Sequence, residues 1–239
     1  MILHVYIFLI GTVLGSFYSV VASRVPLQQS IITPRSHCQH CGYTLGIGEL
    51  IPIVSFCLQK GRCKYCKEKI SYLYLLIEVI TGIAFLIPTF FISSYAQLIF
   101  IWAVLSLLVI VTMTDILYML IPNVILIFFA VFFLFERIFL SKGIWWNEII
   151  SSLCIFSVLY FIGWIYKGGI GGGDVKLLTL LAFVIGIEGV TITILLASLF
   201  GLIFIFGATL FGYMRYRDPI PFAPFISAGT ICTLILLYN

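Results

Sequence analysis

Hydrophobic residues run along most of this chain in long continuous stretches, separated by short polar segments. Continuous runs of about 20 apolar residues are typical of helices that cross a lipid bilayer, whereas the strands of a membrane barrel alternate with a period of two. The pattern therefore predicts an all-α, polytopic membrane protein with about eight transmembrane helices. The expected spans are residues 4–22, 73–93, 97–114, 121–140, 147–166, 175–187, 190–212 and 220–238.

Composition excludes most other classes of protein. Of the 239 residues, 62% are hydrophobic and 9% are charged, whereas about a quarter of the residues of an ordinary globular domain carry a charge. A chain of this kind has too little polar surface for a soluble enzyme and too much apolar sequence for a disordered protein. A secreted disulfide scaffold is excluded on the same grounds.

One polar stretch interrupts the apolar runs and divides the chain into three parts. It contains seven of the 13 Lys and Arg residues. Because Lys and Arg gather in cytoplasmic loops, we expect this stretch in the cytoplasm and the N-terminus outside. The predicted parts are a first transmembrane helix (1–23), a cytoplasmic loop with four cysteines (24–71) and a multi-helix membrane domain (72–239).

The other basic residues agree with this orientation. With eight spans, eleven of the 13 Lys and Arg residues lie on the cytoplasmic side and two lie outside. Beyond residue 71, those inside are Lys167, Lys176, Arg215 and Arg217, and those outside are Arg137 and Lys142.

The four cysteines of the polar loop form two pairs. Cys38 and Cys41 are followed, after 21 residues, by Cys63 and Cys66. Two CxxC pairs supply four thiolates for a tetrahedral site, for which zinc is the usual metal. Two disulfides are the alternative, but the cytosol is reducing. The zinc is expected to be structural, because so short a polar loop has little apolar core of its own.

Other thiols and imidazoles have smaller expected roles. Gly42, after the first pair, is expected at positive φ, where a tight turn requires it. Three residues of the loop are possible substitute ligands, and two cysteines in the spans are expected to be packing residues. The substitutes are His37, His40 and Cys57, and the packing residues are Cys154 and Cys232.

Two aspartates lie at the predicted membrane boundary. Asp115 follows the third span, and Asp174 closes the glycine-rich turn 171–173 before the sixth. A carboxylate at the edge of the hydrocarbon region is costly, which favours a functional role. Two such groups close together share one proton, so one can activate water while the other protonates a leaving amine. The alternative is that each is an interfacial loop residue, with Lys176 as a partner for Asp174.

The turns next to the aspartates have sequence signals of their own. The glycines at 171–173 fit a close approach of the backbone and unusual φ angles. Pro122 is expected to end the helix beyond Asp115 and to help form a short cytoplasmic bend.

Seven motifs spread along the chain make the functional prediction more specific. They are GSFYSVVASRVP (15–26), PRSHCQHCG (34–42), ELIPIVS with GRCKYC (49–55 and 61–66), DILYMLIPN (115–123), GGGDVK (171–176) and PFAPFISAG (221–229). Together they resemble the bacterial prepilin peptidases, or type IV leader peptidases, which are intramembrane aspartic proteases of the GxGD type. Two positions depart from that pattern: Asn123 replaces a usual acidic residue, and Ala223 replaces a usual glycine.

The resemblance implies a two-step processing enzyme. It implies that Asp115 and Asp174 are the catalytic pair that cuts the basic leader of type IV prepilin or pseudopilin precursors at the cytoplasmic face. Such precursors serve pili, DNA uptake or secretion. Many family members then N-methylate the new N-terminus with S-adenosylmethionine. The implied location is the inner (cytoplasmic) membrane, with lipid and precursor as partners and no nucleic acid.

Glu78 is the candidate residue for methyl transfer. It lies near the cytoplasmic end of the second span and resembles the family's glutamate after the cysteine loop. An intramembrane carboxylate can bind a cation, such as the substrate amine or the sulfonium of the methyl donor. The alternative is a packing contact with Arg24 or with a hydroxyl group, and Arg24 itself fits a topology anchor.

Three other functions compete with this one. Intramembrane carboxylates and glycine breaks also mark ion transporters, although both aspartates lie at one interface here. A binding module would use the loop for docking and the spans as an anchor, which leaves the aspartates without a role. A peptidase without methyltransferase activity stays open, because the chain has no Rossmann-type glycine motif.

Overall fold

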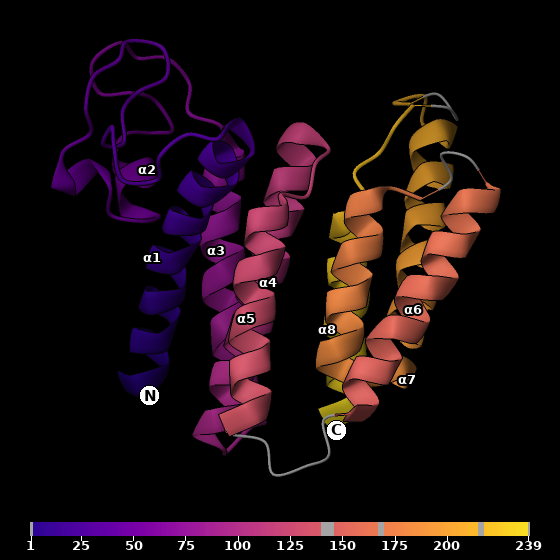
Figure 1. Ribbon diagram of the computed structural model, residues 1–239. Coiled ribbons are helices and arrows are strands. Elements are labelled where there is room, and N and C mark those ends of the chain that lie inside the picture. The colour runs from indigo at the N-terminus through magenta and orange to yellow at the C-terminus, as the bar shows by residue number, and fades with distance from the viewer. Residues whose placement is uncertain (1, 140–145, 167–169, 215–217, 239) are drawn as a thin grey trace. The chain divides into compact units, whose positions relative to one another are not determined.

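The computed structural model describes residues 2–139, 146–166, 170–214 and 218–238, which form helices and no β-strand (Figure 1). The all-α prediction is therefore confirmed. Lys142, Lys167, Arg215 and Arg217 lie outside the described residues. The elements are α1 (Ile2–Arg24), η1 (Val25–Leu27), η2 (Ile47–Glu49), α2 (Val54–Leu58), α3 (Tyr72–Leu86), η3 (Ile87–Phe90), α4 (Tyr95–Tyr118), α5 (Asn123–Phe139), α6 (Trp146–Ile165), α7 (Gly172–Leu210) and α8 (Ala223–Tyr238).

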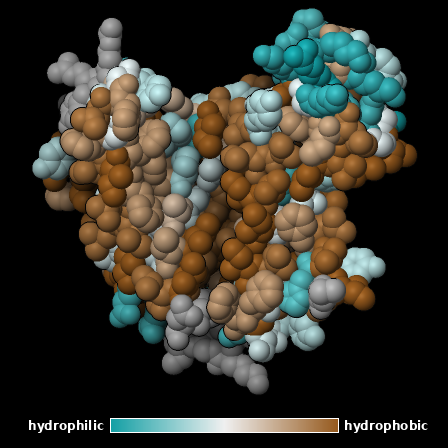
Figure 2. Space-filling model, turned by 180° about the vertical axis from the view of Figure 1, so that it is seen from behind, coloured by the Kyte–Doolittle hydropathy of each residue, from teal (hydrophilic) through white to brown (hydrophobic). Residues whose placement is uncertain are grey.

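These helices have the length and composition of membrane spans. Among the described residues, five segments are long and apolar enough to cross a bilayer, and they contain α1, α3, α4, α6 and α7. Hydrophobic residues cover the helical surface in Figure 2, while hydrophilic residues gather on the loop between α1 and α3. A polytopic membrane protein is thus confirmed, and the count of eight crossings stays a prediction.

Helix α7 is interrupted inside its length. Its 39 residues would span about 58 Å as one straight helix, roughly twice the hydrocarbon thickness of a bilayer. Gly186 has φ 74° and ψ 176°, which is not helical, and Figure 1 shows the two halves as separate columns. The break falls where the sixth and seventh predicted spans meet, so α7 supplies both.

The chain divides into two compact units, Met1–Met113 and Thr114–Asn239. In the first, α1 packs against α3 through small residues. A Cβ added to Gly11 would lie 2.9 Å from the Cα of Gly82, and one added to Gly15 would lie 2.9 Å from Thr81 Oγ1. This is the close approach that a GxxxG pattern permits in membrane helices, and the pattern GTVLG at 11–15 signals it.

In the second unit, α7 packs against α5, α6 and α8. A Cβ on Gly229 of α8 would lie 2.8 Å from the carbonyl oxygen of Thr193 in α7. At the break, Arg137 Nη2 donates to the carbonyl oxygen of Val184 at 2.9 Å, and its Nη1 lies 3.5 Å from Glu148 Oε1. Arg137 therefore caps the end of the first half of α7.

Candidate functional site

The four paired cysteines come together in the folded loop. Their sulfur atoms all lie within 4.8 Å of one another, and Cys38 Sγ lies 3.8 Å from Cys66 Sγ. A tetrahedral zinc ion with bonds of about 2.3 Å places its sulfur ligands about 3.8 Å apart. The four thiols therefore fit a zinc ion. All of them are free cysteines, so the geometry does not favour the disulfide alternative.

Two similar turns build this cluster. The amide of Gly42 donates to the carbonyl of Cys38 at 2.9 Å, and that of Lys67 donates to Cys63 at 3.0 Å. Both residues have positive φ, 70° for Gly42 and 60° for Lys67. The prediction of positive φ for Gly42 is confirmed. The positive φ of Lys67 could not be predicted from the sequence, because only glycine, which has no Cβ, adopts this conformation freely.

The thiols differ in acidity because of their surroundings. Backbone hydrogen bonds from Cys41 and His40 lower the pKa of Cys38 to about 6. The Glu68 amide lowers the pKa of Cys66, but burial and the three neighbouring thiols outweigh it and raise that pKa to about 12. Four thiols this close cannot all ionise alone, whereas a bound cation favours four thiolates.

Asp115 lies in the last turn of α4 and is buried, with 6% of its surface exposed. Its Oδ2 accepts a hydrogen bond of 2.8 Å from the amide of Ala223, the first residue of α8, and a further one from Phe222. A carboxylate at a helix N-terminus is favoured by the free amides and the helix dipole. These amide donors were not predicted; the PFAP sequence (221–224) at the start of the last span was the available signal.

The amide contact shows that alanine at position 223, in place of the usual glycine, is compatible with the hydrogen bond to Asp115. Ala223 interacts with Asp115 through its backbone N–H. A glycine would donate in the same way, so the methyl side chain does not remove the hydrogen bond.

Asp174 lies in the first turn of α7, after the N-cap residue Gly171. A Cβ on Gly171 would lie 2.9 Å from Asp174 Oδ2, and one on Gly173 would lie 3.0 Å from Ile121 Cβ. The predicted close backbone approach is therefore confirmed. The predicted unusual φ angles are wrong: Gly171 has φ −65° and Gly172 and Gly173 are helical, because the helix begins inside the glycine run.

The two segments that carry the aspartates touch each other. Helix α4 ends at Tyr118 and α5 begins at Asn123, with Pro122 in the predicted bend. This bend supplies Ile121, which contacts the Gly173 backbone, and Lys176 Nζ donates to Asn123 Oδ1 at 2.9 Å. Two carboxylates therefore share one end of the second unit, where Lys176 donates to Asn123.

Glu78 and Arg24 each form hydrogen bonds with the backbone of the cysteine loop. Glu78 Oε2 accepts a hydrogen bond of 2.8 Å from the amide of Ile53. Arg24 Nη1 donates to the carbonyl oxygens of Ser30 and Pro34 at 3.1 and 2.7 Å. The hydrogen-bond partner of Glu78 is therefore a backbone amide of the loop. The packing contact predicted for Glu78 was instead with Arg24 or with a hydroxyl group.

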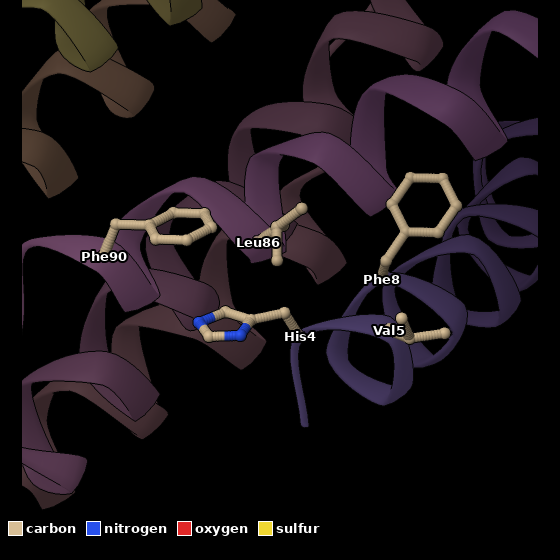
Figure 3. Close-up of a pocket in the computed structure, with 5 residues that line it drawn as sticks. All are labelled: His4, Val5, Phe8, Leu86 and Phe90. Carbon is tan, nitrogen blue, oxygen red and sulfur yellow. The ribbon is translucent and has the colours of Figure 1, made fainter. Parts of the chain in front are cut away.

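A pocket in the first unit lies away from these groups. It opens between the start of α1 and the end of α3, where His4 stacks on Phe90 with ring centroids 4.7 Å apart (Figure 3). Because α3 starts after the cysteine loop, the pocket lies at the opposite end of the helix pair. Its lining has no carboxylate or thiol.

Most of the chain matches known proteins. Residues 9–92 match the bacterial peptidase A24 N-terminal domain, and residues 102–206 match the type IV leader peptidase family. The prepilin leader peptidase/N-methyltransferase of Bacillus subtilis (strain 168) is 40% identical over 233 residues, 98% of this chain and 93% of that protein.

Two further relatives are more distant. The protein of the same description from Burkholderia pseudomallei (strain 1026b) is 28% identical over 94% of this chain and 82% of its own length. The type 4 prepilin-like proteins leader peptide-processing enzyme of Escherichia coli O78:H11 is 28% identical over 95% of this chain and 91% of its own. No solved structure matches.

Proposed function

Because the chain belongs to the type IV leader peptidase family, we propose that it is the enzyme that removes the leader peptide of type IV prepilin-like precursors and methylates the new N-terminus. The observation that carries the peptidase is the contact between the bend after Asp115 and the first turn of α7, which holds Asp174.

Asp115 and Asp174 act as a general base and a general acid. One carboxylate takes a proton from water, and the water oxygen bonds to the scissile carbonyl carbon. The C–N bond then breaks, and the leaving amine takes a proton from the other carboxyl group. The amides of Phe222 and Ala223 orient Asp115 for this step.

The membrane delivers the substrate to this pair. The apolar helix of a precursor enters the bilayer beside the spans, so that its basic leader stays at the cytoplasmic face. The loop 24–71 and both aspartates lie on that side of the inner membrane, which the concentration of Lys and Arg in the loop supports. A pseudopilin precursor presents the same features.

Mass spectrometry of a prepilin-like precursor tests the peptidase. Incubation with the full-length protein in membranes should yield the leader-free product, and Asp115→Asn and Asp174→Asn should each abolish it. Glu188→Gln is the matched control, because Glu188 is an exposed carboxylate just after the break at Gly186, 14 residues beyond Asp174. Full cleavage by either Asn variant would refute the aspartate pair.

A zinc ion would be held by the thiolates of Cys38, Cys41, Cys63 and Cys66. It would supply folding free energy to a loop with little core of its own. The basic residues around the cluster offset part of its negative charge.

Methyl transfer uses S-adenosylmethionine as the methyl donor. Glu78 is proposed to bind a cationic group in this step, either the substrate amine or the sulfonium of the donor. A Glu78→Gln variant removes the charge but keeps an oxygen that can accept the Ile53 amide, whereas Glu78→Ala removes both. If Glu78 binds a cation, the Gln variant should cleave the precursor without adding the methyl mass. Methylation by the Gln variant and its loss only in the Ala variant would assign Glu78 to anchoring the loop.

A further inference from the structure

The segment between the two cysteine pairs contacts the first turns of α3. Its Ile53 amide is bonded to Glu78, which lies six residues inside α3, or about 9 Å along the helix axis. The Phe56 ring lies 5.5 Å from the ring of Tyr72, the first residue of α3. The segment therefore runs beside the first turns of a membrane span instead of above them.

The side chains of this segment are aliphatic and exposed. Ile47 and Leu58 have 82% and 78% of their surfaces exposed, and Val54 has 49%. In contrast, Phe56 is turned inward, against Tyr72 and Gly61. Residues 47–58 contain one charged residue, Glu49. Such a surface is unfavourable in water and is favoured at the boundary between lipid headgroups and acyl chains.

Basic residues follow this aliphatic surface directly. The second cysteine turn, residues 60–69, has five Lys or Arg residues and one Glu. An aliphatic surface bordered by basic side chains is the arrangement by which interfacial segments bind membranes with anionic lipids. The basic residues are Lys60, Arg62, Lys64, Lys67 and Lys69.

We propose that residues 47–58 form an interfacial membrane segment, which inserts Val54 and Leu58 among the acyl chains while residues 60–69 contact anionic headgroups. The loop is continuous with α1 and α3, so the bilayer that surrounds these helices already borders it. Glu78 fixes its depth through Ile53. The four-thiol cluster thereby stands on the membrane surface instead of extending into the cytosol.

A polypeptide is the competing occupant of this surface. An amphipathic partner would also cover Ile47 and Leu58. The position of Ile53 beside α3 favours lipid, because a span that lies in the bilayer brings acyl chains to that depth without any partner. The five basic residues would in turn repel a basic leader peptide.

Carbene footprinting of the unmodified full-length protein tests the proposal. The protein is placed in vesicles of phosphatidylcholine, or of phosphatidylcholine and phosphatidylglycerol in equal parts, with a bilayer-soluble diazirine reagent. Residues 51–58 should be labelled several-fold more than residues 38–46, and more strongly with phosphatidylglycerol. Labelling of 51–58 no greater than that of 38–46 would overturn insertion, and equal labelling in both vesicles would overturn the contact with anionic headgroups.

Two variants test whether the labelling depends on the aliphatic side chains. Leu58→Gln should lower labelling of 51–58 severalfold, whereas Arg35→Gln, at an exposed position outside residues 47–69, should leave insertion in place. Equal zinc content in both variants shows that the loop is folded. Unchanged labelling of 51–58 in Leu58→Gln would overturn the proposal. Protection of 51–58 from labelling by an added precursor would also overturn it, because the surface would then bind a polypeptide.

Discussion

Replacement of Gly229 by alanine tests whether the packing of α8 on α7 controls the aspartate site. The added Cβ would lie 2.8 Å from the carbonyl oxygen of Thr193 and 3.1 Å from the amide nitrogen of Ala197. Both atoms belong to the backbone of α7, so no side-chain rotation relieves the contact. The two helices must move apart until the separation is ordinary, which begins at 3.4 Å.

The displacement has two consequences of different size. A separation of roughly 0.6 Å should lower the free energy of unfolding by about 1–3 kcal/mol through lost packing. The higher helix propensity of Ala offsets at most about 1 kcal/mol of this loss. Ala223 lies six residues earlier on the same helix and donates to Asp115 at 2.8 Å. A shift of this size lengthens that hydrogen bond toward its limit and should lower the cleavage rate by about tenfold.

Two assays measure these effects side by side. Thermal unfolding of the purified protein in detergent reports stability, and the initial rate of precursor cleavage reports the site. Gly207→Ala is the matched control, since a Cβ at that position of α7 has nothing within 4 Å. If Gly229→Ala unfolds at the parent temperature and cleaves at the parent rate, the close α7–α8 contact does not position Asp115.

Three further changes probe the rest of the fold. Cys63→Ser should abolish the zinc content measured by elemental analysis, whereas Cys57→Ser should keep it, because Cys57 lies outside the four-thiol cluster; equal zinc in both would refute the cluster as the metal site. Arg137→Leu removes the cap on the break in α7 and leaves the partly buried Glu148 without this partner. The variant should be less stable by about 2–3 kcal/mol in thermal unfolding, and an unchanged midpoint temperature would contradict this. Gly11→Ala meets the α3 backbone at 2.9 Å and should cost about 1–3 kcal/mol, whereas Gly163→Ala, with open space around it, should cost nothing; equal stability of the two would show that α1 and α3 tolerate separation.

Local pattern was sufficient to predict the helices and the four cysteines that cluster in the loop. Each predicted span coincides with a helix or with half of α7, because burial in lipid acts on every residue of an apolar run. The four cysteines were found by spacing alone, since each CxxC turn is local. The glycine run shows the limit of such reasoning: close backbone approach was predicted correctly, but helix α7 already begins at Gly172, which keeps ordinary φ angles there.

The sequence by itself therefore determined the class of the protein, the helices and the residue types of both candidate sites. Tertiary structure decided which of these residues meet. The hydrogen bond from Ala223 to Asp115 joins residues 108 positions apart, and that from Ile53 to Glu78 joins residues 25 apart. Such contacts depend on how glycine-lined helix surfaces fit together. Hydropathy and spacing report only on neighbours along the chain, so they do not contain this information.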